Sequence, residues 1–202
     1  MSLLTSSPTN IKMIKGIIFD CDGTLADTMP LHWRAWQVIT QRHKLHFPED
    51  RFYALGGVPS RDILKMLGEE QGVSIDHIKV AHEKEDAYLP LLPHVGPIEC
   101  VVEIAKANRG KIPMAVASGG TKANIEKVLV HLKIRDWFDA VVTSEDVQNQ
   151  KPAPDIFLEA ARRIGVAPQF CRGYEDTDLG MQAIRAAGMD AVDVREMLVA
   201  RS

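Results

Sequence analysis

Apolar and polar residues follow two patterns along this chain, and the change between the patterns divides it into parts. Outside residues 29–94, short apolar runs bounded by turn residues alternate with segments of helical periodicity. The apolar runs predict strands at 13–20, 111–117, 138–143, 170–174 and 190–194. The periodic segments predict helices at 98–105, 122–132, 155–164 and 179–187. Strands that alternate with helices predict an α/β fold, a Rossmann-like parallel sheet with helices on both faces.

Residues 29–94 contain no segment with the pattern of a strand. Apolar residues recur at helical spacing at 31–39 and 63–67, and a polar, charged helix is predicted at 75–88. A glycine-containing loop at 56–60 separates two of these helices. We therefore predict a small α-helical cap domain inserted at 29–94. The remaining parts are a Rossmann-like core formed by 13–28 and 95–202, and a flexible tail at 1–12.

Polar side chains stand near the starts of several predicted helices. We expect Thr28, Ser60 and Asp178 to cap the N-termini of the helices that follow them, because a side-chain oxygen there accepts a free backbone N–H. Large apolar side chains are expected to form a separate core for the cap. They are Trp33, Trp36 and Phe47.

Composition excludes several classes of protein. The 202 residues are 46% hydrophobic and 25% charged, which is ordinary for a globular protein, and the net charge of −3 gives no indication of a nucleic-acid partner. No apolar run is long enough to span a membrane, and the first dozen residues lack the apolar segment of a signal peptide. Three cysteines without paired spacing predict a reduced, cytoplasmic compartment. We expect a monomer.

Two carboxylates end the first predicted strand. Asp20 and Asp22 are separated by one residue, so they point the same way if the extended conformation continues through them. Carboxylates held this close repel each other, and a cation or a shared proton normally stabilises the pair. The alternative is that both residues simply form a polar turn, in which Asp and Gly are common.

Polar residues also follow the other predicted strands. Ser118 ends the second strand, Lys151 follows the third, and Glu175 with Asp176 ends the fourth. Because the carboxyl ends of parallel strands lie at one edge of a sheet, these side chains are expected to meet there. The carboxylates suit Mg²⁺, while the hydroxyl, the ammonium and nearby backbone N–H groups suit a phosphoryl group. The N–H groups expected to help belong to Gly23, Thr24 and Gly119.

Four stretches resemble the four motifs of the haloacid dehalogenase superfamily. They are FDCDGTLADT, the serine at 118 after an apolar strand, KPAPD at 151–155 and YEDT at 174–177. Their order and spacing cover nearly the whole chain. The chain is most similar to the beta-phosphoglucomutase-like branch, which carries a small helical cap. Within that branch, LHWRAW and GMQAIRAAGMDAVDV resemble phosphatases that act on fructose 1-phosphate and similar sugar phosphates.

The resemblance implies a role for each matching residue. Asp20 is expected to attack phosphorus and form an aspartyl-phosphate. Asp22 is expected to protonate the leaving alkoxide and then to activate the hydrolytic water. Ser118 and Lys151 are expected to bind the phosphoryl oxygens. The residues expected to hold the cofactor Mg²⁺ are Asp20, Asp22 through its backbone carbonyl, Asp176, and Glu175 either directly or through water.

Two cap residues are candidates for contact with the substrate. His32 lies at the start of the cap, where the family often carries a histidine; it either orients substrate or Asp22, or simply packs there. Arg61 would reach a second anionic group of the substrate, although a solvated arginine is the usual case.

Three functions remain open at this stage. A Mg²⁺-dependent phosphatase for a small phosphorylated sugar is favoured. A beta-phosphoglucomutase-type phosphomutase is the alternative, but Gly56 replaces the lysine of the mutase pattern, and the following arginine is displaced to Arg61. A catalytically silent binding protein is disfavoured because no motif residue is missing.

Overall fold

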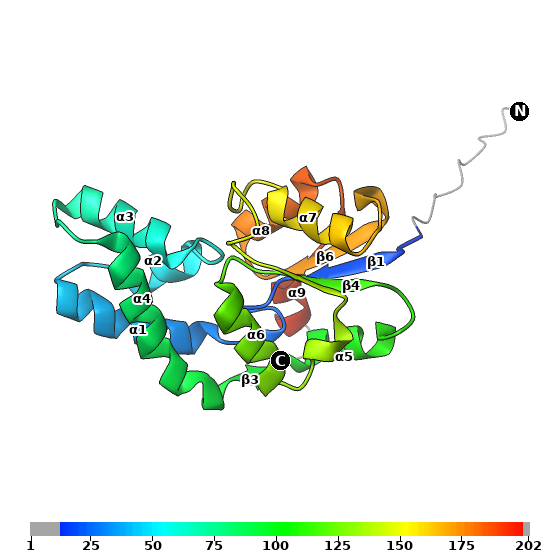
Figure 1. Ribbon diagram of the computed structural model, residues 1–202, viewed down its shortest axis with the longest axis horizontal. Helices are drawn as coiled ribbons and strands as arrows, with labels where there is room; N and C mark the ends of the chain where they lie inside the picture. The colour runs from blue at the N-terminus through cyan, green and yellow to red at the C-terminus, as the bar shows by residue number, and fades with distance from the viewer. Residues whose placement is uncertain (1–12, 200–202) are drawn as a thin grey trace, which may run out of the picture.

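A parallel sheet covered by helices lies beside a separate group of helices in the computed structural model, which describes residues 13–199 (Figure 1). The predicted tail at 1–12 lies outside the described residues. Within 13–199, five strands form the parallel sheet in the order β5–β4–β1–β6–β7. They are β1 Gly16–Phe19, β4 Met114–Ala117, β5 Ala140–Val142, β6 Cys171–Glu175 and β7 Asp190–Asp193. The predicted α/β fold with a parallel sheet is confirmed.

Strand β1 lies at the centre of the sheet, paired with β4 on one side and β6 on the other. All four of its residues are buried, as expected for a strand covered on both faces. Ile17 and Phe19 belong to one hydrophobic cluster and Ile18 to another, because successive side chains of a strand point to opposite faces. The chain turns to opposite sides of β1 in its two halves, which places the ligand-binding edge at the carboxyl end of β1.

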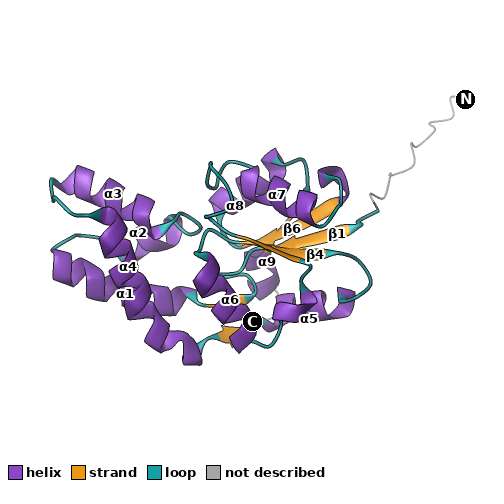
Figure 2. Ribbon diagram, in the orientation of Figure 1, coloured by secondary structure: helices purple, strands orange, loops and turns teal. Residues whose placement is uncertain are grey.

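Helices cover both faces of the sheet (Figure 2). Helices α5 Glu99–Asn108, α6 Lys122–His131 and α9 Val194–Val199 pack on one face, and α7 Asp155–Arg163 and α8 Asp178–Ala186 pack on the other. Two short 3₁₀ helices, η2 Arg135–Trp137 and η3 Pro168–Phe170, lead into strands β5 and β6. No helix among residues 13–199 is long and apolar enough to cross a membrane.

The separate group, which we name the cap, consists of α1 Met29–His43, α2 Glu49–Ala54, α3 Ser60–Gln71 and α4 His77–Tyr88, followed by η1 Leu89–His94. Its apolar side chains form their own buried cluster, to which Trp36 and Phe47 belong and against which Trp33 packs, as predicted. Short strands β2 Ala26–Asp27 and β3 Gly96–Pro97 pair where the chain leaves the core and returns to it. The division of the chain at 28 and 95 stays a prediction.

Two helices were not predicted from the sequence, and a third is longer than the sequence indicated. Helix α2 has six residues with Phe52 as its one buried side chain, and α9 also has six, so neither is long enough to show a period. Helix α3 extends beyond the apolar positions at 63–67, from Ser60 to Gln71. It ends at Gly72, whose φ of 64° is a left-handed conformation that glycine adopts readily.

The three predicted helix caps are wrong, because each of these side chains bonds to another side chain and not to a backbone N–H group at the start of its helix. Thr28 does precede α1, but its hydroxyl donates to Asp22. Ser60 is the first residue of α3, and its hydroxyl donates to Glu85. The side chain that caps α8 is Thr177, whereas Asp178 pairs with Arg195. Two of these hydroxyls therefore serve the region between cap and core.

Candidate active site

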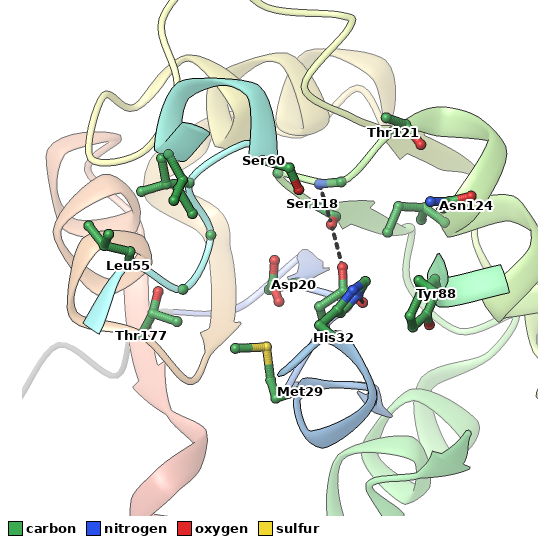
Figure 3. Close-up of a pocket in the computed structure, with 18 of the residues that line it drawn as sticks. Asp20, Met29, His32, Leu55, Ser60, Tyr88, Ser118, Thr121, Asn124 and Thr177 are labelled. Atoms are coloured by element: carbon green, nitrogen blue, oxygen red, sulfur yellow. Dashed lines mark hydrogen bonds and ion pairs between the residues drawn. The ribbon is translucent and has the colours of Figure 1, made fainter. Parts of the chain in front are cut away.

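A cavity lies between the carboxyl ends of the central strands and the cap (Figure 3). The core contributes Asp20, Asp22 and Ser118 to its lining. The cap contributes polar groups of its own, chiefly His32, Lys84 and Glu85. The predicted convergence of the strand ends is therefore observed, and the cap faces it across the cavity.

Lys151 lies behind this cavity, between two buried carboxylates. Its Nζ donates to Oδ1 of Asp20 at 2.7 Å and to Oε2 of Glu175 at 2.6 Å. Burial opposes the charge of Lys151, but the two carboxylates outweigh it and raise the pKa of the ammonium above its ordinary value. Lys151 thus stays charged and fixes the orientation of Asp20.

Asp20, Glu175 and Asp176 bring carboxylate oxygens within 4.8 Å of one another. Burial, together with the charge of Glu175, raises the pKa of Asp176 to about 7 and also raises that of Asp20. One lysine does not balance three carboxylates this close, so the donor set fits a divalent cation. The hydroxyl of Thr24 donates to Oδ1 of Asp176 at 2.9 Å and orients that carboxylate.

Glu175 is already engaged by several donors. Its Oε1 accepts the N–H and the hydroxyl of Thr177 at 3.1 and 2.8 Å, and its Oε2 accepts Lys151. Asp20 and Asp176 are therefore the better candidates for direct metal ligands, with Glu175 holding the lysine beside them. Gly23 packs directly against Asp176: its φ is 87°, and a Cβ there would lie 2.2 Å from Oδ2 of that carboxylate.

Asp22 is held by hydrogen bonds from both sides of the cavity. Its Oδ1 accepts the hydroxyl of Thr28 at 2.7 Å and lies 3.4 Å from Nε2 of His32, while its Oδ2 accepts the hydroxyl of Ser118 at 3.3 Å. Burial disfavours the charged form of Asp22, but the contacts with His32 and Thr28 prevail and lower its pKa to about 2. Asp22 is therefore ionised at neutral pH.

The proton on His32 is fixed by Lys84. Nζ of Lys84 lies 2.9 Å from Nδ1 of His32, and an ammonium has only donors, so Nδ1 accepts. The ring proton is then on Nε2, where it donates to Asp22. Burial and the charge of Lys84 lower the pKa of His32, which agrees with a neutral ring. The imidazole also stacks on Tyr88 with 4.0 Å between ring centroids.

The cap loop touches the core beside the cavity. A Cβ added to Gly119 would lie 2.3 Å from the carbonyl oxygen of Gly57, so the two backbones are in direct contact. Gly57 has a φ of 84°, a conformation that favours glycine. The N–H of Gly120 donates to Oγ of Ser118 at 3.1 Å, which orients the serine hydroxyl.

The structure brings together most of the predicted site residues. Those that line the cavity are Asp20, Asp22, Ser118, Gly119, Glu175 and His32. Those that lie directly behind it are Gly23, Thr24, Lys151 and Asp176. Arg61 does not line this cavity; it borders a neighbouring hollow, where its Nε lies 3.7 Å from Asp62.

Sequence reasoning missed several residues of the site: Thr28, Lys84, Glu85 and Asn124. One signal was available for Lys84. It stands four residues after Val80 and four before Tyr88, so it occupies the buried face of α4, where a lysine is unusual. A similar signal marks Asn124, which stands four residues before Val128 on the buried face of α6.

The chain is similar to known proteins in sequence and in fold. Residues 17–194 match the family model described as haloacid dehalogenase-like hydrolase. The chain is 44% identical over 181 residues to fructose-1-phosphate phosphatase YqaB of Escherichia coli (strain K12), a match that covers 89% of this chain and 96% of the relative. It is 32% identical to a beta-phosphoglucomutase of Bacillus subtilis (strain 168), with 90% and 83% covered.

A solved structure has the same fold. The crystal structure of a beta-phosphoglucomutase from Clostridium difficile superposes with a TM-score of 0.79 at 31% identity, over 90% of this chain and 84% of the other. The prediction of a phosphomonoester hydrolase with the haloacid dehalogenase motifs is confirmed. Family match, sequence identity and fold agree, and the chain belongs to the haloacid dehalogenase-like hydrolases.

Proposed function

We propose that this protein is a Mg²⁺-dependent phosphatase that hydrolyses a small phosphorylated sugar of the fructose 1-phosphate kind through an aspartyl-phosphate. The observation that carries the proposal is that two carboxylates line one cavity and are held there by different hydrogen-bond partners. Asp20 is held by Lys151, whereas Asp22 is held by Thr28, His32 and Ser118. The 44% identity with a fructose-1-phosphate phosphatase supports the choice of substrate.

In the first step Asp20 attacks phosphorus with its free carboxylate oxygen, while Lys151 holds the other oxygen. Ser118 and the backbone N–H of Gly119 are the candidates for binding phosphoryl oxygens. The N–H groups of Gly23 and Thr24, which were also expected to bind them, donate instead to the carbonyl oxygens of Ala26 and Cys21 at 2.8 and 3.3 Å. Asp20 and Asp176 would hold Mg²⁺, with the backbone carbonyl of Asp22 and Glu175 as further candidates. A bound Mg²⁺ would supply neutralisation of the charge that develops on the phosphoryl group.

Asp22 moves the proton in both steps. A bound phosphate disfavours the ionised form of Asp22, because like charges repel, and so raises its pKa toward the protonated form that a general acid needs. Asp22 then gives its proton to the leaving alkoxide. The ionised Asp22, oriented by Thr28 and His32, next takes a proton from the water that attacks phosphorus; the P–O bond to Asp20 breaks, which releases inorganic phosphate and restores the Asp20 carboxylate.

The cap, residues 29–94, would determine which phosphate ester enters and would exclude bulk water when it contacts the core. The mutase alternative requires the cap to hold a second phosphate. Gly56 occupies the place of the mutase lysine, and a Cβ there would lie 2.7 Å from Cγ2 of Thr177. Among the described residues that line the cavity, Lys84 is the cap's one lysine or arginine, and it already contacts His32 and Glu85.

A phosphate-release screen tests the proposal. The purified protein with Mg²⁺ is offered sugar phosphates, sugar-acid phosphates and nucleotides, with EDTA as the metal-free control. We expect fastest release from a small sugar monophosphate and none in EDTA. Conversion of β-glucose 1-phosphate to glucose 6-phosphate faster than phosphate release would establish the mutase instead. No release from any ester would contradict an active enzyme.

A further inference from the structure

One acidic residue of the cap reaches across the cavity to the core. Oε2 of Glu85, on α4, accepts a short hydrogen bond from Nδ2 of Asn124, on α6. Oε1 of Glu85 accepts Oγ of Ser60 at 3.2 Å and Nζ of Lys84 at 3.1 Å. The two sides of this contact are far apart in sequence, and the roles proposed above for the hydrolysis use neither Glu85 nor Asn124.

The three polar side chains of this group, Ser60, Glu85 and Asn124, line the same cavity as Asp20. Figure 3 shows Ser60 and Asn124 bordering the space around Asp20. The side chain of Glu85 is 18% exposed, so its charge is only partly screened by solvent. Asn124 is buried. The leaving group of a substrate whose phosphate lies at Asp20 would therefore extend toward the hydrogen-bonding side chains of Ser60, Glu85 and Asn124.

The charges around this group favour a neutral leaving group. Lys84 is the one lysine or arginine among the described residues that line this cavity, and it also bonds to His32, while Arg61 borders the neighbouring hollow that Ser60 and Glu85 also line. A second phosphate or a carboxylate on the substrate would face the carboxylate of Glu85 at short range, which is strongly unfavourable in a partly buried site. A sugar hydroxyl can donate to Glu85 and accept from Asn124 or Ser60, so it satisfies the same groups.

We propose that Glu85 and Asn124 form a specificity site that selects phosphomonoesters with a neutral, polyhydroxylated leaving group and rejects substrates with a second anionic group. This inference rests on the proposed phosphatase function. It narrows the substrate class to monophosphates of sugars or sugar alcohols, and it assigns the rejection of bisphosphates to a single charge in the cap.

The test compares fructose 1-phosphate with fructose 1,6-bisphosphate in wild type and in Glu85→Gln, which keeps an oxygen for Asn124 but removes the charge. The products fructose and fructose 6-phosphate are measured separately. We expect wild type to prefer the monophosphate in kcat/KM by at least about tenfold, and Glu85→Gln to reduce that preference by about tenfold. Asp86→Asn removes a charge from the neighbouring, exposed position and should leave the ratio unchanged within about twofold.

The outcomes separate the two proposals. If wild type releases phosphate from neither fructose ester nor p-nitrophenyl phosphate, the phosphatase function fails. If it hydrolyses p-nitrophenyl phosphate but prefers the bisphosphate, or turns over neither fructose ester, the specificity site is refuted while the phosphatase stands. An unchanged ratio in folded Glu85→Gln also refutes the specificity site. The wild-type ratio decides even if that variant does not fold.

Discussion

The core side and the cap side of the cavity each place one buried lysine between two acceptors, but they balance charge differently. In the core, Lys151 faces Asp20 and Glu175, and Asp176 adds a third carboxylate nearby. In the cap, Lys84 faces His32, which is neutral, and Glu85. The core therefore has a deficit of positive charge that a divalent cation can fill, whereas the cap is close to neutral.

This difference separates two tasks. The core groups are suited to the phosphoryl group, which every phosphomonoester shares. The cap groups are suited to the leaving group, which differs between substrates. Changes in the core should therefore affect all substrates alike, and changes in the cap should affect substrates unequally.

The largest effect is expected from removing the core lysine. Lys151→Met leaves Asp20 and Glu175 facing each other, so that one of them takes up a proton and the nucleophile loses its charge. We expect kcat/KM to fall by about 10³-fold for sugar phosphates and for p-nitrophenyl phosphate alike.

The matched cap variant is Lys84→Met. It should cost no more than about 100-fold with a sugar phosphate, because it only misplaces His32 and thus Asp22. Formation of the phosphoenzyme from p-nitrophenyl phosphate, whose leaving group needs no proton, should be affected less. If Lys84→Met lowered the rate by the same factor with both esters, the proposal that cap groups act on the leaving group would be contradicted.

Adding Mg²⁺ should stabilise the core side in a pH-dependent way. The pKa of Asp176 is about 7, above its ordinary value of 3.8, so the stability gained by protonation is present below about pH 4 and is lost as pH rises through 7. Mg²⁺ would bind the ionised carboxylates, so its effect on Tm should be larger at pH 8 than at pH 5. At 100 times its Kd, the gain is about 2.7 kcal/mol, or roughly 5–10 °C.

Differential scanning calorimetry with NaCl at matched ionic strength provides the control for this measurement. Asp178→Asn, at an exposed position near the cluster, should keep the full Mg²⁺ effect. Asp176→Asn should lose most of it. A Tm shift of equal size at both pH values would show that Mg²⁺ does not bind these carboxylates.

A smaller effect is expected from removing the hydroxyl of Thr28, which precedes the first cap helix and donates to Asp22. Thr28→Val removes the 2.7 Å hydrogen bond to Asp22, which is worth about 1.5 kcal/mol for a charged acceptor. We expect kcat for a sugar phosphate to fall roughly tenfold. Thr40→Val, on the helix that follows Thr28, removes a hydroxyl that bonds only to backbone carbonyls of α1 and should leave kcat unchanged. Equal kcat in both variants would show that the Thr28 hydroxyl does not contribute to proton transfer by Asp22.

The two sides also differ in how far the sequence predicts them. Asp20, Ser118 and Asp176 follow strands, and a parallel sheet brings the carboxyl ends of its strands to one edge. A local pattern therefore predicts that residues far apart in the sequence lie close together. Lys84 and Glu85 stand on a helix whose overall pattern is polar and charged. The spacing of Val80, Lys84 and Tyr88 marks the buried face of that helix, but which groups this face meets depends on tertiary packing, which no local pattern contains.

The hydroxyls of Thr28 and Ser60 also show how far a local sequence pattern can predict a contact. Thr28 and Ser60 precede or begin helices, and at such positions a cap is the normal expectation. Each instead bonds to a carboxylate brought close by tertiary packing, Asp22 and Glu85 respectively. The competing acceptor becomes visible only in the folded chain, in which α3 and α4 of the cap bring Ser60 to Glu85 and the turn after β1 brings Thr28 to Asp22.

The central claim is that Asp20 attacks phosphorus. Excess enzyme is mixed with the sugar phosphate that has the highest kcat/KM, labelled in its phosphate, and the reaction is quenched within a single turnover. We predict label on the peptide that contains Asp20, removable by hydroxylamine as expected for an acyl phosphate, and no label in Asp20→Asn. Release of phosphate at the full rate without labelled protein, or with the label on another residue, would contradict the account.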